Sequence, residues 1–269
     1  EAMKKNQRTL YDELIRFYLL ATDNDNVVLK HIRASMGAMV RKLRKSIPAN
    51  TPVKSKIRQL LRFVYDEWGF HCDAETYFYT RNLYLPYVLE MRVGMPVVLG
   101  AIVLYLAEKL ALPLYPVNFP TQLILRAEVE GGPIFIDPWD GRPVSLDKLQ
   151  KLYEGAFGFG ASPEKQMLEQ ADLSELIDRF QQLVKNTLIR EEHNDVAYKY
   201  VESLISCQNN PYDIRDRGLI LAQMGAYSAA INDLEYFVDH CPEDPTAFIL
   251  KNQLGELKAE WDHDVSFVH

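Results

Sequence analysis

The sequence predicts an α+β domain, in which helices precede a small antiparallel sheet, followed by a second domain made only of helices. Three observations support this order: apolar residues recur at helical spacing near the N-terminus, short β-rich runs follow in the middle, and helical patterns repeat toward the C-terminus. The 269 residues, 48% hydrophobic and 25% charged, have the composition of a folded globular protein and not of a disordered chain. We place the first domain at 1–165 and the second at 172–269, with a glycine-rich stretch at 155–160 leading into the linker.

Four helices are predicted before the sheet. Prolines 48 and 52 mark the loop before the third, and the fourth, at 94–110, begins with Gly94 and Pro96 and is apolar almost all round, as expected of a helix in the centre of a core. The first three are amphipathic, with apolar positions three and four residues apart: Leu10, Leu14, Phe17 and Ala21; Ile32, Met36, Met39, Val40 and Leu43; Ile57, Leu60, Leu61 and Val64.

The pattern changes after the fourth helix. Residues 114–119, 122–129 and 134–136 form short β-rich runs, and the last two are separated by the turn sequence 130–133, which contains two glycines and a proline. A small antiparallel sheet is therefore predicted.

The second domain contains a repeat. Seven residues fall on the small, aromatic and proline positions of a tetratricopeptide unit: Gly218, Gly225, Tyr227, Ala230, Leu234, Phe237 and Pro242. A weaker copy aligns Ala197, Val201 and Leu204 with Ala230, Leu234 and Phe237, and a final helix is predicted at 246–260. Such stacks present a groove for a protein or peptide partner. Arg215, Arg217 and Gln223 are candidate partner-binding residues, although the two arginines could instead bridge to Asp213 and Asp216.

Charge is distributed unevenly. The net charge is −7, yet residues 30–62 hold ten Lys or Arg and no Asp or Glu. This basic segment could meet phosphate or an acidic partner, or it could be the solvated face of two helices. No aromatic residues lie between the cations as a base-stacking surface would require, so the solvated face is favoured over nucleic acid.

Other function classes are not supported by the sequence. Cys72, Cys207 and Cys241 have no CxxC spacing, and the histidines have no metal-ligand spacing, so neither a disulfide framework nor a metal site is expected. We expect no cofactor, because P-loop and dinucleotide-binding patterns are missing. The apolar runs are too short for a membrane span and the N-terminus has no secretory pattern, so we expect a cytoplasmic protein.

Three segments resemble the bacterial SirB family: residues 92–100 (RVGMPVVLG), 119–126 (FPTQLILR) and 136–139 (IDPW). The residues that carry the motif are Arg92, Gly94, Pro120, Arg126 and Pro138. The resemblance implies a transglutaminase-like N-terminal domain and C-terminal tetratricopeptide repeats, which agrees with the pattern of helices and strands.

The resemblance also implies where a catalytic triad would lie. Active transglutaminase-like enzymes carry a Cys at the start of the central helix, a His on a strand and an Asp on the next strand. Here the nucleophile position holds Met95 or Pro96, the histidine position holds Gln122, and only Asp137 is retained. We call these four residues the relic site. The hairpin register predicts that Gln122 and Asp137 are diagonal neighbours, either as a hydrogen-bonded pair left from His–Asp or as structural residues that cap backbone groups and begin a turn.

We therefore expect a non-catalytic protein that binds a protein or peptide partner through its repeats, as an adaptor or regulator. One alternative is a cysteine-dependent amidase or peptidase that uses Cys72, which lies between His71 and Asp73. The other is a nucleic-acid-associated regulator that uses the basic segment 30–62.

Overall fold

The computed structural model describes residues 8–23 and 25–267, with side chains up to residue 259. Residues 1–7 of the predicted first domain and 268–269 of the second lie outside this range. The chain divides into two compact units, 1–182 and 183–269.

The three predicted amphipathic helices are confirmed as α1 (Leu10–Ala21), α2 (Asn26–Ser46) and α3 (Val53–Arg62). The Thr9 hydroxyl accepts a hydrogen bond from the Asp12 amide while the Asp12 carboxylate accepts one from the Thr9 amide, a capping box that fixes the start of α1. The Asp25 carboxylate accepts the Val27 and Val28 amides and caps α2. α3 continues into a π-helical turn, Phe63–Glu67.

The central helix is α5 (Pro96–Lys109), and its middle residues are fully buried, as the all-round apolar sequence predicts. It packs on α1, α2 and α3 and on the first two strands of the sheet. A 3₁₀ turn (Thr80–Leu83) and a short helix, α4 (Leu85–Met91), precede it and were not predicted from the sequence.

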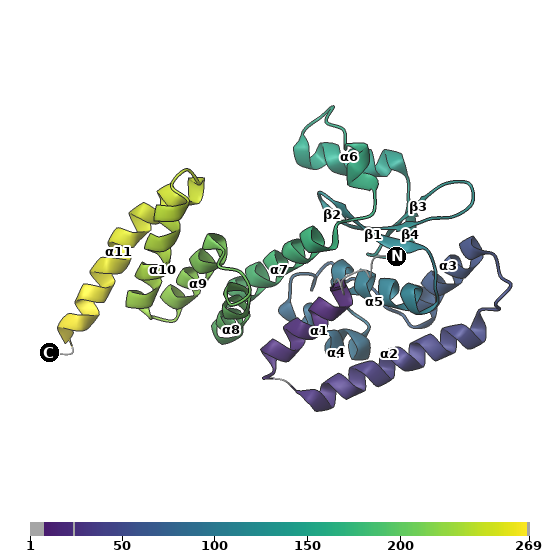
Figure 1. Cartoon of the computed structure of the whole chain (residues 1–269), viewed down its shortest axis with the longest axis horizontal. Coiled ribbons are helices and arrows are strands. Elements are labelled where there is room, and N and C mark those ends of the chain that lie inside the picture. The colour runs from purple at the N-terminus through teal and green to yellow at the C-terminus, as the bar shows by residue number, and fades with distance from the viewer. Residues whose placement is uncertain (1–7, 24, 268–269) are drawn as a thin grey trace, which may run out of the picture. The chain divides into compact units, whose positions relative to one another are not determined.

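The sheet has four antiparallel strands in the order β1 (Leu114–Phe119), β2 (Gln122–Ala127), β3 (Ile134–Asp137) and β4 (Arg142–Val144). The first three match the predicted runs, and the three-residue β4 is an addition. α5 lies on one face, where a Cβ on Gly100 would come within 2.6 Å of Leu123. α6 (Leu146–Phe157) covers the other face, as Figure 1 shows. Its Leu149 packs into the cluster on that face.

The boundary between the units lies inside α7 (Leu173–Arg190), about ten residues beyond the predicted start of the second domain at 172. The physical reason is that the chain returns to the sheet after the glycine-rich segment. The Ala171 amide donates to the Pro116 carbonyl of β1 at 2.8 Å, and the Gln181 amide donates to the Glu13 carboxylate of α1 at 2.9 Å. Of the glycines at 155–160, Gly155 lies within α6, Gly158 ends the helix and Gly160 lies in the following loop, which is followed by a 3₁₀ turn at Lys165–Leu168.

The second unit contains α8 (Asn194–Ile205), α9 (Pro211–Gln223), α10 (Tyr227–His240) and α11 (Pro245–Phe267), with each helix packed on the next. A Cβ on Gly218 would lie 2.9 Å from Leu234, so glycine is required where α9 crosses α10. Ala230, Leu234 and Phe237 are fully buried, which confirms the repeat positions predicted from the sequence. Among the described residues, no helix combines the length and the apolar character that a bilayer crossing requires.

Candidate functional site

Gln122 and Asp137 are hydrogen-bonded to each other. Gln122 opens β2 and Asp137 ends β3, and the register Leu125↔Ile136 makes them diagonal neighbours. The Gln122 Nε2 donates to Asp137 Oδ2 at 3.1 Å. The other carboxylate oxygen, Oδ1, accepts the Trp139 amide at 2.9 Å, so Asp137 also begins the turn that follows β3. The aspartate is thus both hydrogen-bonded to Gln122 and the first residue of a turn.

The start of α5 offers no nucleophile. Met95 is the N-cap residue and is fully buried, and its amide donates to the Asn82 carbonyl at 3.1 Å. Pro96 takes the first helical position, where a missing N–H costs nothing. One turn later, a Cβ on Gly100 would lie 3.3 Å from the Cβ of Pro138, so this end of the helix packs beside the strand end that carries Asp137. The helix N-terminus would lower the pKa of a thiol at this position, but the apolar side chain of Met95 occupies it.

Two motif residues shape the approach to α5. Arg92 ends α4 in the left-handed conformation, with φ of 63°, and its guanidinium lies over the Phe70 ring at 4.6 Å. Burial lowers the pKa of Arg92 from its ordinary value. Gly94 has no room for a side chain, because a Cβ would lie 2.8 Å from Val88. Both residues therefore stabilise the turn between α4 and α5 that positions Met95.

The remaining motif residues hold the ends of the strands. Arg126 forms ion pairs with Glu128 at 2.6 Å and with Glu169 at 2.8 Å. The carbonyl of Pro120 accepts a hydrogen bond from Arg179 of α7 at 3.1 Å, and the carbonyl of Pro138 accepts one from the Tyr65 hydroxyl at 2.7 Å. Arg179 also donates to the Phe119 carbonyl at 2.5 Å, so α7 fixes the β1–β2 turn from which Gln122 emerges.

Cys72 lies within electrostatic reach of the relic site, which the sequence could not establish. It is buried, and burial, followed by the charges of Asp73 and Asp137, raises the pKa of its thiol to about 12. The thiol is therefore protonated near neutral pH, whereas an activated cysteine has a pKa below its ordinary value.

Aromatic side chains surround the end of β3. Tyr77 stacks on Trp139 with ring centroids 5.8 Å apart and meets Phe78 edge-on at 4.6 Å. Trp139 is 37% exposed and Phe78 is 59% exposed, so part of this cluster faces solvent. Sequence analysis did not single out these residues, although the run 77–79 and the tryptophan directly after Asp137-Pro138 are visible in it.

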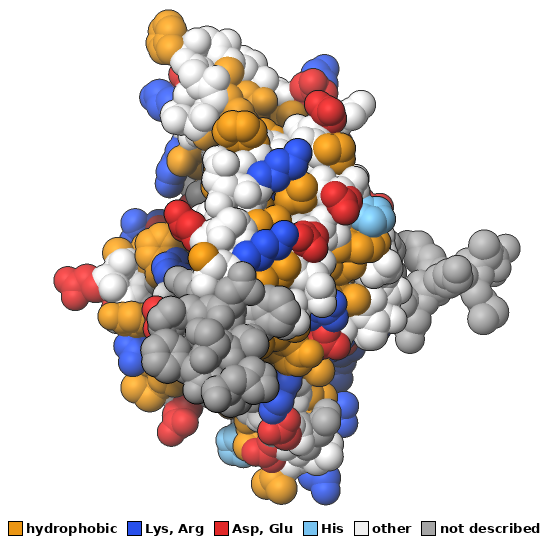
Figure 2. Space-filling model, turned by 90° about the vertical axis from the view of Figure 1, so that its left-hand side faces the viewer, with side chains coloured by type: hydrophobic (Ala, Val, Ile, Leu, Met, Phe, Trp, Pro, Cys, Tyr) orange, Lys and Arg blue, Asp and Glu red, His pale blue; other side chains and the backbone are white. Residues whose placement is uncertain are grey.

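In the second unit, the two candidate arginines are engaged within the fold. Arg217 donates to both carboxylate oxygens of Asp233 at 2.7 Å and also to Glu202, and these bonds, above all those to Asp233, raise its pKa. Arg215 donates to Asp216 at 2.7 Å. The face drawn in Figure 2 likewise shows basic side chains beside acidic ones, with hydrophobic side chains between them. Only Gln223 of the three candidates is exposed.

Asp213 has a different partner from the one considered at the sequence level. Lys185, on α7, places its Nζ 2.6 Å from Asp213 Oδ1 and 2.6 Å from Asp216 Oδ2, and its side chain is only 4% exposed. The lysine thereby joins α7 to α9 within the second unit.

The basic segment 30–62 faces solvent, with only Lys56 half-buried among its ten cations. Arg44 donates to the Lys109 carbonyl, Lys56 to the Ala49 carbonyl, and Arg62 pairs with Glu67. The other seven have no hydrogen bond or ion pair to any described residue: Lys30, Arg33, Arg41, Lys42, Lys45, Lys54 and Arg58. Within residues 8–23 and 25–267, no group of three His, Cys, Asp or Glu is arranged to hold a metal.

Comparison with known proteins gives the same two parts. A family model described as transglutaminase-like superfamily matches residues 30–182, and one described as tetratricopeptide repeat matches 184–255. A UPF0162 protein of Haemophilus influenzae is 59% identical over 99% of this chain and 100% of its own length. UPF0162 protein YchA of Escherichia coli is 36% identical over 96% of this chain and 89% of its own length. Protein SirB1 of Salmonella typhimurium is 38% identical over 75% of this chain and 76% of its own length. No solved structure matches the chain significantly.

Proposed function

This chain belongs to the transglutaminase-like family that includes SirB1 and the UPF0162 proteins, and from this premise we propose that it is a non-catalytic binding protein, an adaptor or regulator with a protein or peptide partner. The observation that carries the proposal is the Gln122–Asp137 hydrogen bond near a helix start that holds a buried Met95.

The chemistry of the relic site supports the absence of catalysis. Acyl transfer by a covalent route needs a nucleophile and a base that accepts its proton. A glutamine amide neither gains nor loses a proton near neutral pH, and neither Met95 nor Pro96 can attack a carbonyl. The cysteine-dependent alternative relies on Cys72, and the raised pKa of its thiol opposes that role.

Two surfaces support binding. Trp139 and Phe78 expose aromatic rings beside the relic site, and such rings contribute large contact areas at little entropic cost. In the second unit, one stripe of α9 contains Tyr212, Arg215, Leu219 and Gln223 at three- and four-residue spacing. Its middle packs on the core formed with α10, and its two ends, Tyr212 and Gln223, are exposed. Arg217 is committed to Asp233 and Glu202, and Arg215 to Asp216, so the exposed Gln223 remains the strongest of the three predicted candidates.

The test combines a binding assay with an activity assay on the full chain. Partner retention from a bacterial lysate is compared for the parent, the double variant Arg215→Met with Gln223→Lys, and Lys251→Glu as an exposed control on α11. The proposal expects a partner that the parent and the control retain and that the double variant loses while it remains folded, as circular dichroism would show. It also expects no amidase or acyl-transfer activity in the parent or in Gln122→His. Activity in the parent that disappears in Cys72→Ala would establish an enzyme instead.

A second candidate function is supported by the exposed, unpartnered cations of α2. These could bind a polyanion, with nucleic acid as the case that the sequence raised. Arg41→Glu, Lys42→Glu and Lys45→Glu together would then abolish binding to duplex DNA, which would weaken with salt by a slope of about −0.9 per phosphate contact. Binding that is independent of salt, or equal in the triple variant, would exclude this candidate.

A further inference from the structure

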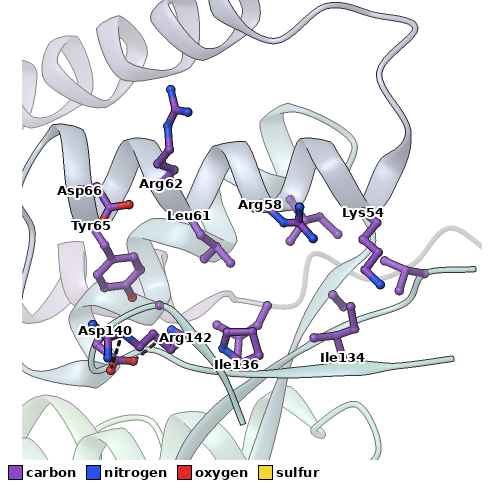
Figure 3. A pocket seen from close by; sticks show the side chains of 15 residues that line it. Lys54, Arg58, Leu61, Arg62, Tyr65, Asp66, Ile134, Ile136, Asp140 and Arg142 are labelled. Atoms are coloured by element: carbon purple, nitrogen blue, oxygen red, sulfur yellow. Dashed lines mark hydrogen bonds and ion pairs between the residues drawn. The ribbon is translucent and has the colours of Figure 1, made fainter. Parts of the chain in front are cut away.

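The first unit contains a cavity of about 790 Å³ between α3 with its π-helical turn and the strands β2, β3 and β4. Figure 3 shows α3 on one side and the strand residues Ile134 and Ile136 on the other, with Leu61 pointing between them. The volume lies within the roughly 300–1,000 Å³ typical of small-molecule sites. None of the motif residues of the relic site lines it.

The cavity carries an excess of positive charge. Arg62 pairs with Glu67 at 2.8 Å and points away from the strands in Figure 3, and Arg142 lies 3.6 Å from Asp140. The other two cations of the lining are Lys54 and Arg58, and neither has a hydrogen bond or ion pair to any residue that the structure describes. They are four residues apart on α3, so their side chains leave the same face of the helix and can approach one anion.

Asp66 adds a second carboxylate to that of Asp140, beside Tyr65 in Figure 3, and most of the other lining residues are aliphatic. Ile57, Leu61, Val129, Ile134, Ile136 and Pro143 contribute the apolar surface of the cavity. The single aromatic residue among the lining residues, Tyr65, is held in place, because its hydroxyl donates to the Pro138 carbonyl at 2.7 Å and its ring lies against Gly141. This composition suits an alkyl chain better than a nucleobase, which would need a free aromatic face for stacking.

We propose that this cavity binds a straight-chain fatty acid, with the carboxylate between Lys54 and Arg58 and the alkyl chain along Leu61, Ile134 and Ile136. An arginine and a lysine on one helix face provide charge-assisted hydrogen bonds to a carboxylate, and the guanidinium can bind both of its oxygens. The alkyl chain replaces water over the aliphatic wall and gains hydrophobic free energy with each methylene. This ligand is independent of the partner-binding function proposed above.

The experiment is a calorimetric titration of the full chain with hexanoate, octanoate and decanoate, each below the concentration at which it forms micelles. The dissociation constant should fall about fourfold for each added methylene while the chain still finds aliphatic wall. Decanol, which has the same chain without the carboxylate, should bind at least tenfold more weakly than decanoate.

Variants identify the site. Lys54→Gln with Arg58→Gln should weaken decanoate binding at least tenfold and remove the difference between decanoate and decanol. Arg62→Gln is the matched control. Arg62 lies on the same helix but its side chain points away from the strands, so its replacement should leave the affinity for decanoate unchanged. Leu61→Asp, at a half-buried position, should abolish binding at an unchanged circular dichroism spectrum.

The proposal would be overturned by no heat of binding with decanoate, by equal affinity in the Lys54→Gln/Arg58→Gln variant, or by displacement of decanoate by inorganic phosphate with no dependence on chain length. The last result would indicate a simple anion site. Loss of binding in Arg62→Gln would equally refute the placement of the carboxylate.

Discussion

Lys185 is expected to be a major source of stability in the second unit. Its ammonium lies 2.6 Å from carboxylate oxygens of both Asp213 and Asp216, and the side chain is 4% exposed. Replacing it by methionine keeps most of the apolar length and removes the charge, which leaves two buried carboxylates with one cation fewer. Removing one partner of a buried ion pair costs about 3–5 kcal/mol, and the lower end applies here because Asp216 keeps Arg215.

A loss of about 3 kcal/mol should lower the melting temperature of residues 183–269 by about 15 °C, on the scale of roughly 4–8 °C per kcal/mol for a domain of this size. Differential scanning calorimetry of the full chain measures the shift. Lys251→Met, an exposed lysine on α11, is the control and should stay within about 0.5 kcal/mol of the parent. Asp213→Asn added to Lys185→Met should recover part of the loss, because it removes the orphaned charge. A shift below 4 °C in Lys185→Met, or no recovery in the double variant, would refute the electrostatic argument.

Three further predictions concern Gly141 and Cys72 of the first unit. Gly141→Ala should destabilise the chain by about 3 kcal/mol, because a φ of 71° is strained for alanine and the added Cβ would lie 2.2 Å from the Tyr65 ring. Gly69→Ala is the control: it has the same φ but open space around it, and it should cost only about 1 kcal/mol. Equal losses of stability for the two variants in chemical denaturation would contradict the role of the overlap with Tyr65. Because burial raises the pKa of the Cys72 thiol to about 12, the folded state keeps a proton that the unfolded state releases, so stability should fall as pH rises from 9 to 12, and less steeply in Cys72→Ala. Alkylation followed by peptide mass spectrometry should show exposed Cys207 reacting much faster than Cys72 at pH 8, and a fast Cys72 would be inconsistent with this pKa.

The elements that sequence analysis predicted are those with a long, regular pattern. α5 was recognised because residues 95–107 form an uninterrupted apolar run. The first three strands were recognised from their β-rich runs, the last two of which flank a glycine turn. α4 has only seven residues, too few for a helical period to be distinguished from chance, and β4 has three residues with Pro143 in the middle. Short elements of this kind are set by tertiary packing more than by local sequence.

The candidate site likewise has parts that the sequence predicts and parts that it does not. The Gln122–Asp137 pair follows from the hairpin register, which is a local property of two strands joined by a short turn. The electrostatic effect of Asp137 on Cys72 depends on how a segment fifty residues before the hairpin packs in the fold, and no local pattern encodes that. Lys185 was missed for a related reason: a lysine in an amphipathic helix is usually solvated, and its burial depends on the two acids of a later helix.

The relic site also explains why binding is expected at its rim and not in its interior. A working nucleophile must be polar and reachable by substrate, and that requirement costs stability in the folded state. Met95 is fully buried, and Gln122 gives Asp137 a hydrogen-bond donor that does not depend on pH, whereas an imidazole loses a proton near neutrality. The helix start is therefore filled by an apolar side chain, and the half-buried Gln122 and Asp137 are bonded to each other. The groups that remain accessible are the aromatic rings of Trp139 and Phe78, which can contact a partner without any chemistry in the interior, so Trp139→Ala should weaken a partner bound there while leaving the Gln122–Asp137 pair in place.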